Sequence, residues 1–195
     1  LSNHPDEIRK VFDRELDTRI CADFPKVDPE RIAIDPGLPK NKHMRWAALL
    51  RHQTPEEAVA ILRQLKLDND TINRVKTLVQ WWKRPIGADQ TQIRKTMSQM
   101  APELYDDLLV LKTSVGELEL QAEGCVEDLD WVKTQSREIR QRGDCVSLKE
   151  LAVTGADLIQ SGMKPGKELG ETLKRLLELV LEHPEWNTKE ILKKV

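Results

Sequence analysis

Apolar residues recur along this chain at the spacing of an α-helix, and proline and glycine separate one such run from the next. One run is long and regular, and its spacings of three and four residues place every member on one helix face. Its residues are Ile72, Val75, Leu78, Val79 and Trp82. A strand requires alternation with a period of two, and the chain contains no convincing stretch of that kind. The sequence therefore predicts an all-α fold, an elongated helical body with a helical tail and no sheet.

Capping residues and prolines predict where the helices begin. Thr54-Pro55-Glu56-Glu57 is a capping box with proline at the first helical position. Asn69 and Asp89 are the expected caps of the next two helices. The longest expected helix covers residues 117–142. Gly124 weakens this helix by roughly 1 kcal/mol relative to alanine, so the helix could kink or break there.

Four prolines before residue 40 interrupt regular structure and indicate a linker. We therefore expect three parts. Residues 1–40 form an N-terminal helix and the proline-rich linker, and residues 41–116 form a helical body. Residues 117–195 form the long helix and a C-terminal tail domain.

The composition is that of a charge-rich globular protein. Hydrophobic residues make up 39% of the chain and charged residues 33%, and no apolar run is long enough to span a bilayer. The net charge of −2 means that any RNA contact must come from local basic patches, and no DNA partner is expected. Three distant cysteines favour a reducing cytoplasm over a disulfide framework or zinc site. The first residue, Leu1, suggests a fragment of a longer protein.

The turn at residues 162–170 is the stretch most informative about function. Lys164 and Lys167 place positive charge beside the free amides of a helix that is expected to start at Pro165. Gly166 lets the backbone approach a ligand closely. Such an arrangement suits a phosphate. The alternative is structural, since a glycine commonly ends one helix and a proline starts the next.

Two stretches carry a more specific pattern. The first reads Leu151-Ala-Val-Thr-Gly-Ala-Asp-Leu-Ile, with Gly162-x-Lys164-Pro165-Gly166, Gly170 and Leu173 behind it. The second reads Met44-Arg-Trp-Ala-Ala-Leu-Leu-Arg51-His52, followed by Ala58, Ile61-Leu62 and Leu65-Lys66-Leu67-Asp68-Asn69. Both resemble the bacterial CCA-adding enzymes, the tRNA nucleotidyltransferases of the poly(A) polymerase-like family. The first looks like their tail domain and the second like their helical body.

Many members of that family have an HD-type domain that reads Leu-Leu-His-Asp at the second stretch. Here Arg51 stands in place of the histidine and His52 in place of the aspartate. Arginine cannot ligate a metal because it stays protonated and has no lone pair to offer. The resemblance therefore implies a degenerate HD-type domain that lacks its metal centre, and it argues against a phosphohydrolase.

The chemistry of the resembled family requires a nucleotidyltransferase head, with a Gly-Gly-x-x-Arg-Asp loop and an Asp-x-Asp pair for two Mg²⁺ ions. The chain contains no such loop. Asp68-Asn-Asp70 is expected at a helix start and Asp128-Leu-Asp130 inside a helix, so neither is expected to bind catalytic metal. The resemblance implies no catalytic residue, metal or cofactor in this chain, which is expected to be inactive alone. Mg²⁺ and CTP or ATP belong to the missing head.

The resemblance implies tRNA as the partner. Arg137 and Arg140 share a helix face at a spacing of three residues, and they are candidate RNA-binding residues. Lys164, Gly166 and Lys167 are the other candidates. Such residues contact backbone phosphates and give affinity and register without reading sequence. The alternative for each cluster is an ordinary charged helix face.

The function we expect is that of the C-terminal body and tail of a CCA-adding tRNA nucleotidyltransferase, which positions the tRNA. The alternative is a degenerate HD-like helical scaffold for protein–protein interaction or a homodimer, which an exposed apolar patch on helix 117–142 would favour. Trp81-Trp82 could stack on a base, but one ring in the core and the other half-exposed is the favoured interpretation.

Overall fold

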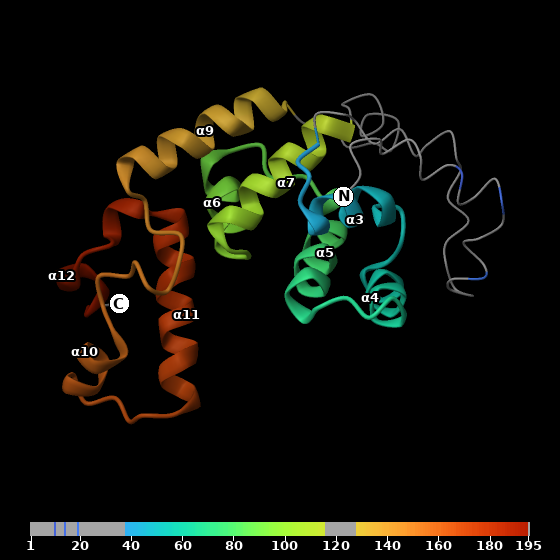
Figure 1. Cartoon of the computed structure of the whole chain (residues 1–195). Coiled ribbons are helices and arrows are strands. Elements are labelled where there is room, and N and C mark those ends of the chain that lie inside the picture. Colours follow the sequence, from blue (N-terminus) through green and yellow to red (C-terminus); the bar gives the residue numbers. More distant parts are fainter. Residues whose placement is uncertain (1–9, 11–13, 15–18, 20–37, 116–127, 195) are drawn as a thin grey trace. The chain divides into compact units, whose positions relative to one another are not determined.

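The computed structural model describes residues 38–115 and 128–194, together with residues 10, 14 and 19. All regular structure in these residues is helical, so the predicted all-α fold is confirmed (Figure 1). The expected N-terminal helix and proline-rich linker lie almost entirely outside the described residues. No helix in the described part of the chain is both long and apolar enough to cross a membrane.

The chain divides into two compact units, and each takes its residues from two separate stretches. Unit 1 comprises residues 1–85 and 102–129, and unit 2 comprises residues 86–101 and 130–195. The domain boundaries expected at residues 40 and 116 stay predictions.

In unit 1, helix α5 (Asn69–Trp82) packs against three other helices. These are α3 (Lys42–Leu50), α4 (Pro55–Gln64) and α7 (Pro102–Val115). The apolar face of α5 expected from the sequence is buried along its whole length, from Ile72 to Trp82. Helix α3 is buried as well, since Met44 and Leu50 are fully inaccessible to solvent. Each such side chain stabilises the unit by about 1.5–3 kcal/mol.

The start of α5 differs by one residue from the sequence prediction. Asp68 is the N-cap and Asn69 is the first helical residue, so the prediction of Asn69 as the cap is wrong. The Asp68 carboxylate accepts hydrogen bonds from the Thr71 amide at 2.8 Å and from the Thr71 hydroxyl at 2.9 Å. The bond from the backbone of Thr71, followed by that from its side chain, lowers the pKa of Asp68 from 3.8 to about 2.

We expect Asp68→Asn to lower the stability of the protein at neutral pH, and the difference from the wild type to disappear in acid. Asparagine keeps the capping geometry but cannot carry the charge. Because the folded pKa of Asp68 lies below its unfolded value, its contribution is complete above pH 4 and is lost as the pH falls towards 2. Urea unfolding midpoints measured for both proteins between pH 7 and pH 2 test this expectation. A difference independent of pH would contradict it.

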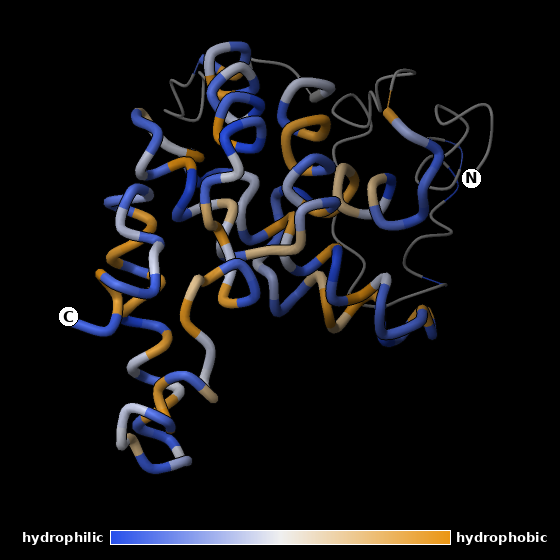
Figure 2. The backbone as a smooth tube through the Cα atoms, turned by 90° about the vertical axis from the view of Figure 1, so that its left-hand side faces the viewer, coloured by the Kyte–Doolittle hydropathy of each residue, from blue (hydrophilic) through white to orange (hydrophobic). Residues whose placement is uncertain are grey.

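In unit 2, helix α11 (Lys167–Glu182) packs against α6 (Gln90–Ser98), α10 (Gly155–Gln160) and the 3₁₀ helix η3 (Pro184–Trp186). The unit also contains α9 (Leu129–Arg142) and α12 (Lys189–Leu192). Hydrophobic and hydrophilic residues alternate along the helical parts of the tube, as expected for helices with one apolar face (Figure 2). Its core contains Cys145, Leu151, Val153, Leu158, Leu176, Val180 and Leu192.

Helix α9 is shorter than the sequence predicts. Residue Asp128 is not helical and α9 begins at Leu129, so the prediction of one helix over residues 117–142 is wrong. Residues 116–127, including Gly124, lie outside the described residues. Asp130 occupies the first turn of α9, where a carboxylate interacts favourably with the positive end of the helix dipole. This acidic residue indicates a helix start near residue 129, which the spacing of the apolar residues alone does not reveal.

Helix α11 begins at Lys167, so the prediction that Pro165 is its first residue is wrong. Gly166 precedes the helix with φ 154° and ψ −163°, a conformation that is essentially restricted to glycine. Since this backbone is not helical, the helix cannot include Pro165. Gly162 has φ 101° just beyond the end of α10, as expected for a glycine that ends a helix.

Candidate nucleic-acid interface

Helix α9 carries a row of basic side chains, which we call the α9 stripe: Lys133, Arg137 and Arg140. Spacings of four and three residues place them on one face of the helix. Arg137 and Arg140 are exposed, and Arg137 has no partner among the described residues. Lys133 is half-buried and its ammonium lies 3.4 Å from the Asp130 carboxylate. The structure therefore brings both predicted arginines to the same surface.

The second candidate is the turn before α11, with Lys164, Gly166 and Lys167. All three residues are exposed, and the N-cap residue Gly166 has no side chain that could cap the amides at the start of α11. The Lys167 ammonium lies 3.6 Å from the Glu171 carboxylate, and both side chains are largely exposed. Such a surface pair contributes little and is easily exchanged for another anion. Lys164 has no partner within the described residues.

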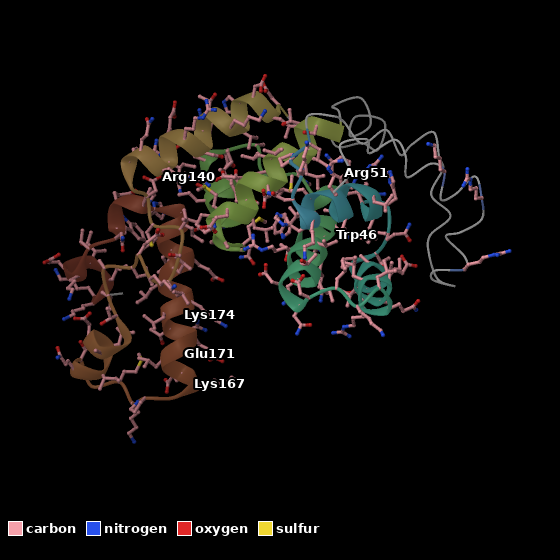
Figure 3. The ribbon with its side chains drawn as sticks, in the orientation of Figure 1. Trp46, Arg51, Arg140, Lys167, Glu171 and Lys174 are labelled. Atoms are coloured by element: carbon pink, nitrogen blue, oxygen red, sulfur yellow. The ribbon has the colours of Figure 1, made fainter. Side chains whose placement is uncertain are left out.

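The α9 stripe and the turn lie at opposite ends of α11. Arg94 Nε donates to the Leu181 carbonyl at 2.7 Å, and Arg94 Nη1 lies 3.3 Å from Asp144, two residues after α9 ends. The end of α9 is therefore close to the C-terminus of α11. Lys167 precedes Leu181 by 14 helical residues, or about 21 Å along the axis. Figure 3 shows Arg140 and Lys167 at these two ends. The five predicted residues thus form two separate surfaces.

Two further basic residues of α11 were not singled out from the sequence. Lys174 and Arg175 are exposed and have no partner in the part of the chain that the structure describes. Lys174 follows Lys167 by seven residues and lies on the same side of α11 (Figure 3). That spacing could have identified it. Glu171 lies between the two lysines, so this surface of α11 attracts anions less strongly than the basic residues alone suggest.

Arg94 and Lys95 of α6 are adjacent basic residues, but neither is available to a ligand. Arg94 is only 4% exposed, and its guanidinium bonds to Asp144, Thr91 and the Leu181 carbonyl. Asp144 also accepts two hydrogen bonds from Arg142, which raise the pKa of Arg142. Lys95 lies 2.7 Å from Glu182. These contacts join α6 to the ends of α9 and α11.

We expect Arg94→Met to destabilise unit 2 by about 3 kcal/mol, because the Leu181 carbonyl loses its hydrogen-bond donor and the Asp144 carboxylate keeps only its bonds to Arg142. Methionine fills a similar volume, so the loss would come from charge and hydrogen bonding rather than from a cavity. Chemical unfolding monitored by circular dichroism measures the change. Lys95→Met, which breaks an exposed pair on the same helix, is the matched control and is expected to have little effect. Equal effects of the two substitutions would contradict the expectation.

The acidic pairs singled out in the sequence have structural partners. Asp68 caps α5, and Asp70 lies 2.9 Å from Arg74. Asp130 lies in the first turn of α9, so the expectation that Asp128-Leu-Asp130 sits inside a helix is wrong. Among the described residues, no three His, Cys, Asp or Glu side chains form a group that could hold a metal ion.

Arg51 and His52 follow the end of α3. Arg51 is 6% exposed and its guanidinium donates to the Ala48 carbonyl, so it packs within unit 1 (Figure 3). A buried, permanently charged guanidinium at this position cannot act as a metal ligand. The residues present therefore do not fit an HD-type metal centre.

The tryptophan pair at the end of α5 is divided between core and surface. Trp82 is fully buried, whereas Trp81 is half-buried and the Arg84 guanidinium lies over its ring, 5.5 Å from the centroid. The interpretation of one buried and one half-exposed ring is confirmed.

These features define a helical protein with exposed basic surfaces and, in its described residues, no metal-binding cluster. The family described as "tRNA nucleotidyltransferase domain 2 putative" matches residues 39–195. The chain belongs to this family, and residues 39–195 are a body domain of a tRNA nucleotidyltransferase. No curated protein and no solved structure matches the chain.

Proposed function

We propose that this chain is the C-terminal body and tail of a CCA-adding tRNA nucleotidyltransferase, and that it holds the tRNA while a separate head adds nucleotides to the 3′ end. The family match over residues 39–195, together with the exposed α9 stripe, carries the proposal. Mg²⁺ and CTP or ATP act in the head and not in this chain. Its body is a degenerate HD-type domain of the kind found in bacterial CCA-adding enzymes. Arg51 and His52 stand where those domains have a histidine and an aspartate that bind metal.

The α9 stripe is the principal RNA contact in this proposal. Arginine presents a planar fork of donors that matches phosphate oxygens, and its charge does not depend on pH near neutrality. Arg137 has no carboxylate partner within the described residues, so no ion pair has to break before it binds RNA. Apolar packing of Val132 and Ile139 on the adjoining face holds the stripe towards solvent.

The turn before α11 is the second contact, about 21 Å from the end of α9 by the length of the helix. Lys164 supplies charge, and the uncapped amides of α11 supply donors to a phosphate oxygen. Two phosphate contacts separated in this way fix the orientation of an RNA stem without reading its sequence.

Binding of the chain to tRNA is expected to weaken steeply as salt rises. Each neutralised phosphate contributes about −0.7 to −0.9 to the slope of log affinity against log salt. Arg137→Gln combined with Arg140→Gln should reduce the steepness of the slope by roughly 1.5, because two contacts are lost. Filter binding across a salt series measures both slopes. Lys66→Gln combined with Lys76→Gln removes the same charge from exposed positions of unit 1 and serves as the control. Absence of binding at low salt would refute the proposal.

Lys164→Glu combined with Lys167→Glu tests the turn. We expect tRNA affinity to fall by about tenfold for each lost phosphate contact near 50 mM salt. Helicity measured by circular dichroism should not change, because Lys164 lies outside α11 and an acidic residue at position 167 interacts favourably with the helix N-terminus. Lys66→Glu combined with Lys76→Glu makes the same change of charge in unit 1. Unchanged affinity in the first double variant would leave the turn with a structural role alone.

A second candidate function is a helical scaffold that forms a homodimer or binds another protein. One observation favours it, the side chain of Trp131 on α9, which is 38% exposed. A single ring is smaller than the apolar patches typical of stable interfaces. Light scattering distinguishes the two functions, since a dimer whose mass does not change with tRNA would support the scaffold.

A further inference from the structure

The C-terminal end of α5 presents an aromatic ring that the core of unit 1 does not require. Trp82 fills the interior and is fully buried, whereas the adjacent Trp81 is only partly covered. Consecutive helical residues point in directions about 100° apart, so burial of one ring turns the other towards the surface. Part of the Trp81 side chain is therefore accessible to solvent.

Arg84 adds a second flat group to this ring. Its guanidinium carbon lies 5.5 Å from the centroid of Trp81, within the distance of a cation–π contact. The guanidinium has no carboxylate partner in the described ranges 38–115 and 128–194. The ring offers a stacking surface and the guanidinium offers a positive charge. Proteins that bind single-stranded nucleic acids use these two features to hold bases and phosphates.

The end of a helix is normally a poor place for a phosphate, because the C-terminal carbonyls carry partial negative charge. A buried lysine lies beside this end of α5. Lys112 of α7 is fully buried, and its ammonium donates to the Arg84 carbonyl at 2.6 Å. Lys83 and Arg84 are exposed beside it. Three basic side chains, Lys83, Arg84 and Lys112, therefore lie close to this end of α5.

We propose that Trp81 and Arg84 form a stacking site for one unpaired base of the bound RNA, while the Arg84 charge interacts with its phosphate. This inference rests on the proposed function for the nature of the ligand. It adds a contact on unit 1 that differs in kind from the α9 stripe, since the stripe binds a paired stem as readily as a single strand. Stacking selects unpaired nucleotides, because bases in a duplex already stack on one another.

Two RNA probes and two substitutions at Trp81 test this site. The probes are a single-stranded RNA of about eight nucleotides and a hairpin stem without unpaired ends. Fluorescence anisotropy with labelled RNA gives the dissociation constants. Trp81→Ala should weaken binding of the single strand by roughly 5- to 150-fold and leave the stem unaffected. Trp81→Phe keeps an aromatic face and should restore most of the affinity.

Substitutions at Arg84 separate stacking from charge. Arg84→Lys keeps the charge but loses the planar group, so it should weaken binding of the single strand less than Trp81→Ala does. Lys76→Gln is the control: Lys76 lies on α5 five residues before Trp81, about 140° around the helix, and its loss should affect both probes equally. Arg84 is exposed, so its variants provide the test even if Trp81→Ala disturbs folding.

The results distinguish this inference from the proposed function. If the wild type binds tRNA but neither Trp81→Ala nor Arg84→Lys alters the affinity for the single strand, the stacking site is refuted and tRNA binding stands. If the wild type binds neither tRNA nor either probe, the proposed function fails and the stacking site fails with it. Selective loss of the single strand in Trp81→Ala, with rescue by Trp81→Phe, supports the site.

Discussion

The buried pair of Arg94 and Asp144 is the contact on which unit 2 depends. A guanidinium that is 4% exposed must find partners for its donors, and here it bonds to a carboxylate, a hydroxyl and the carbonyl of Leu181. These partners come from the loop after α9, from α6 itself and from the end of α11. Apolar packing alone would allow the helices to slide, whereas directional hydrogen bonds to one planar group fix their register. The surfaces of α9 and α11 are oriented by this pair.

Local signals predicted most helices of the described residues, and long-range contacts account for what they missed. The apolar face of α5 follows from spacing, and the capping box at Thr54 is present as expected. The predicted cap of α5 was wrong by one residue because aspartate and asparagine are equally good N-caps. The hydrogen bond between the Thr71 hydroxyl and the Asp68 carboxylate favours Asp68 as the cap. The burial of Arg94 could not be predicted, since Asp144 and Leu181 lie 50 and 87 residues further along the chain.

The candidate site was partly predictable for a similar reason. Spacing on one helix placed Arg137 and Arg140 on a common face, because that relation is local. Whether a basic residue is available to a ligand depends on its partners across the unit, which the sequence does not display. Arg94 is buried and bonds to Asp144, and Lys95 pairs with Glu182. Lys174 has no partner among the described residues and can bind a ligand. The net charge of the chain therefore does not indicate which basic residues can bind a ligand. The partners of each residue in the folded unit do.

Helix α6 lies between α5 and α7 in sequence but packs in unit 2 with α11. During synthesis its buried residues, Ile93 and Met97 among them, emerge long before α11 does. About seventy residues separate the end of α6 from the start of α11, so closure of this contact spans a long loop. A ribosome-bound chain that ends near residue 130 would hold α6 without its partner, and apolar surface would be open to chaperones at that stage. The packing of α6 in unit 2 therefore waits until α11 has been synthesised.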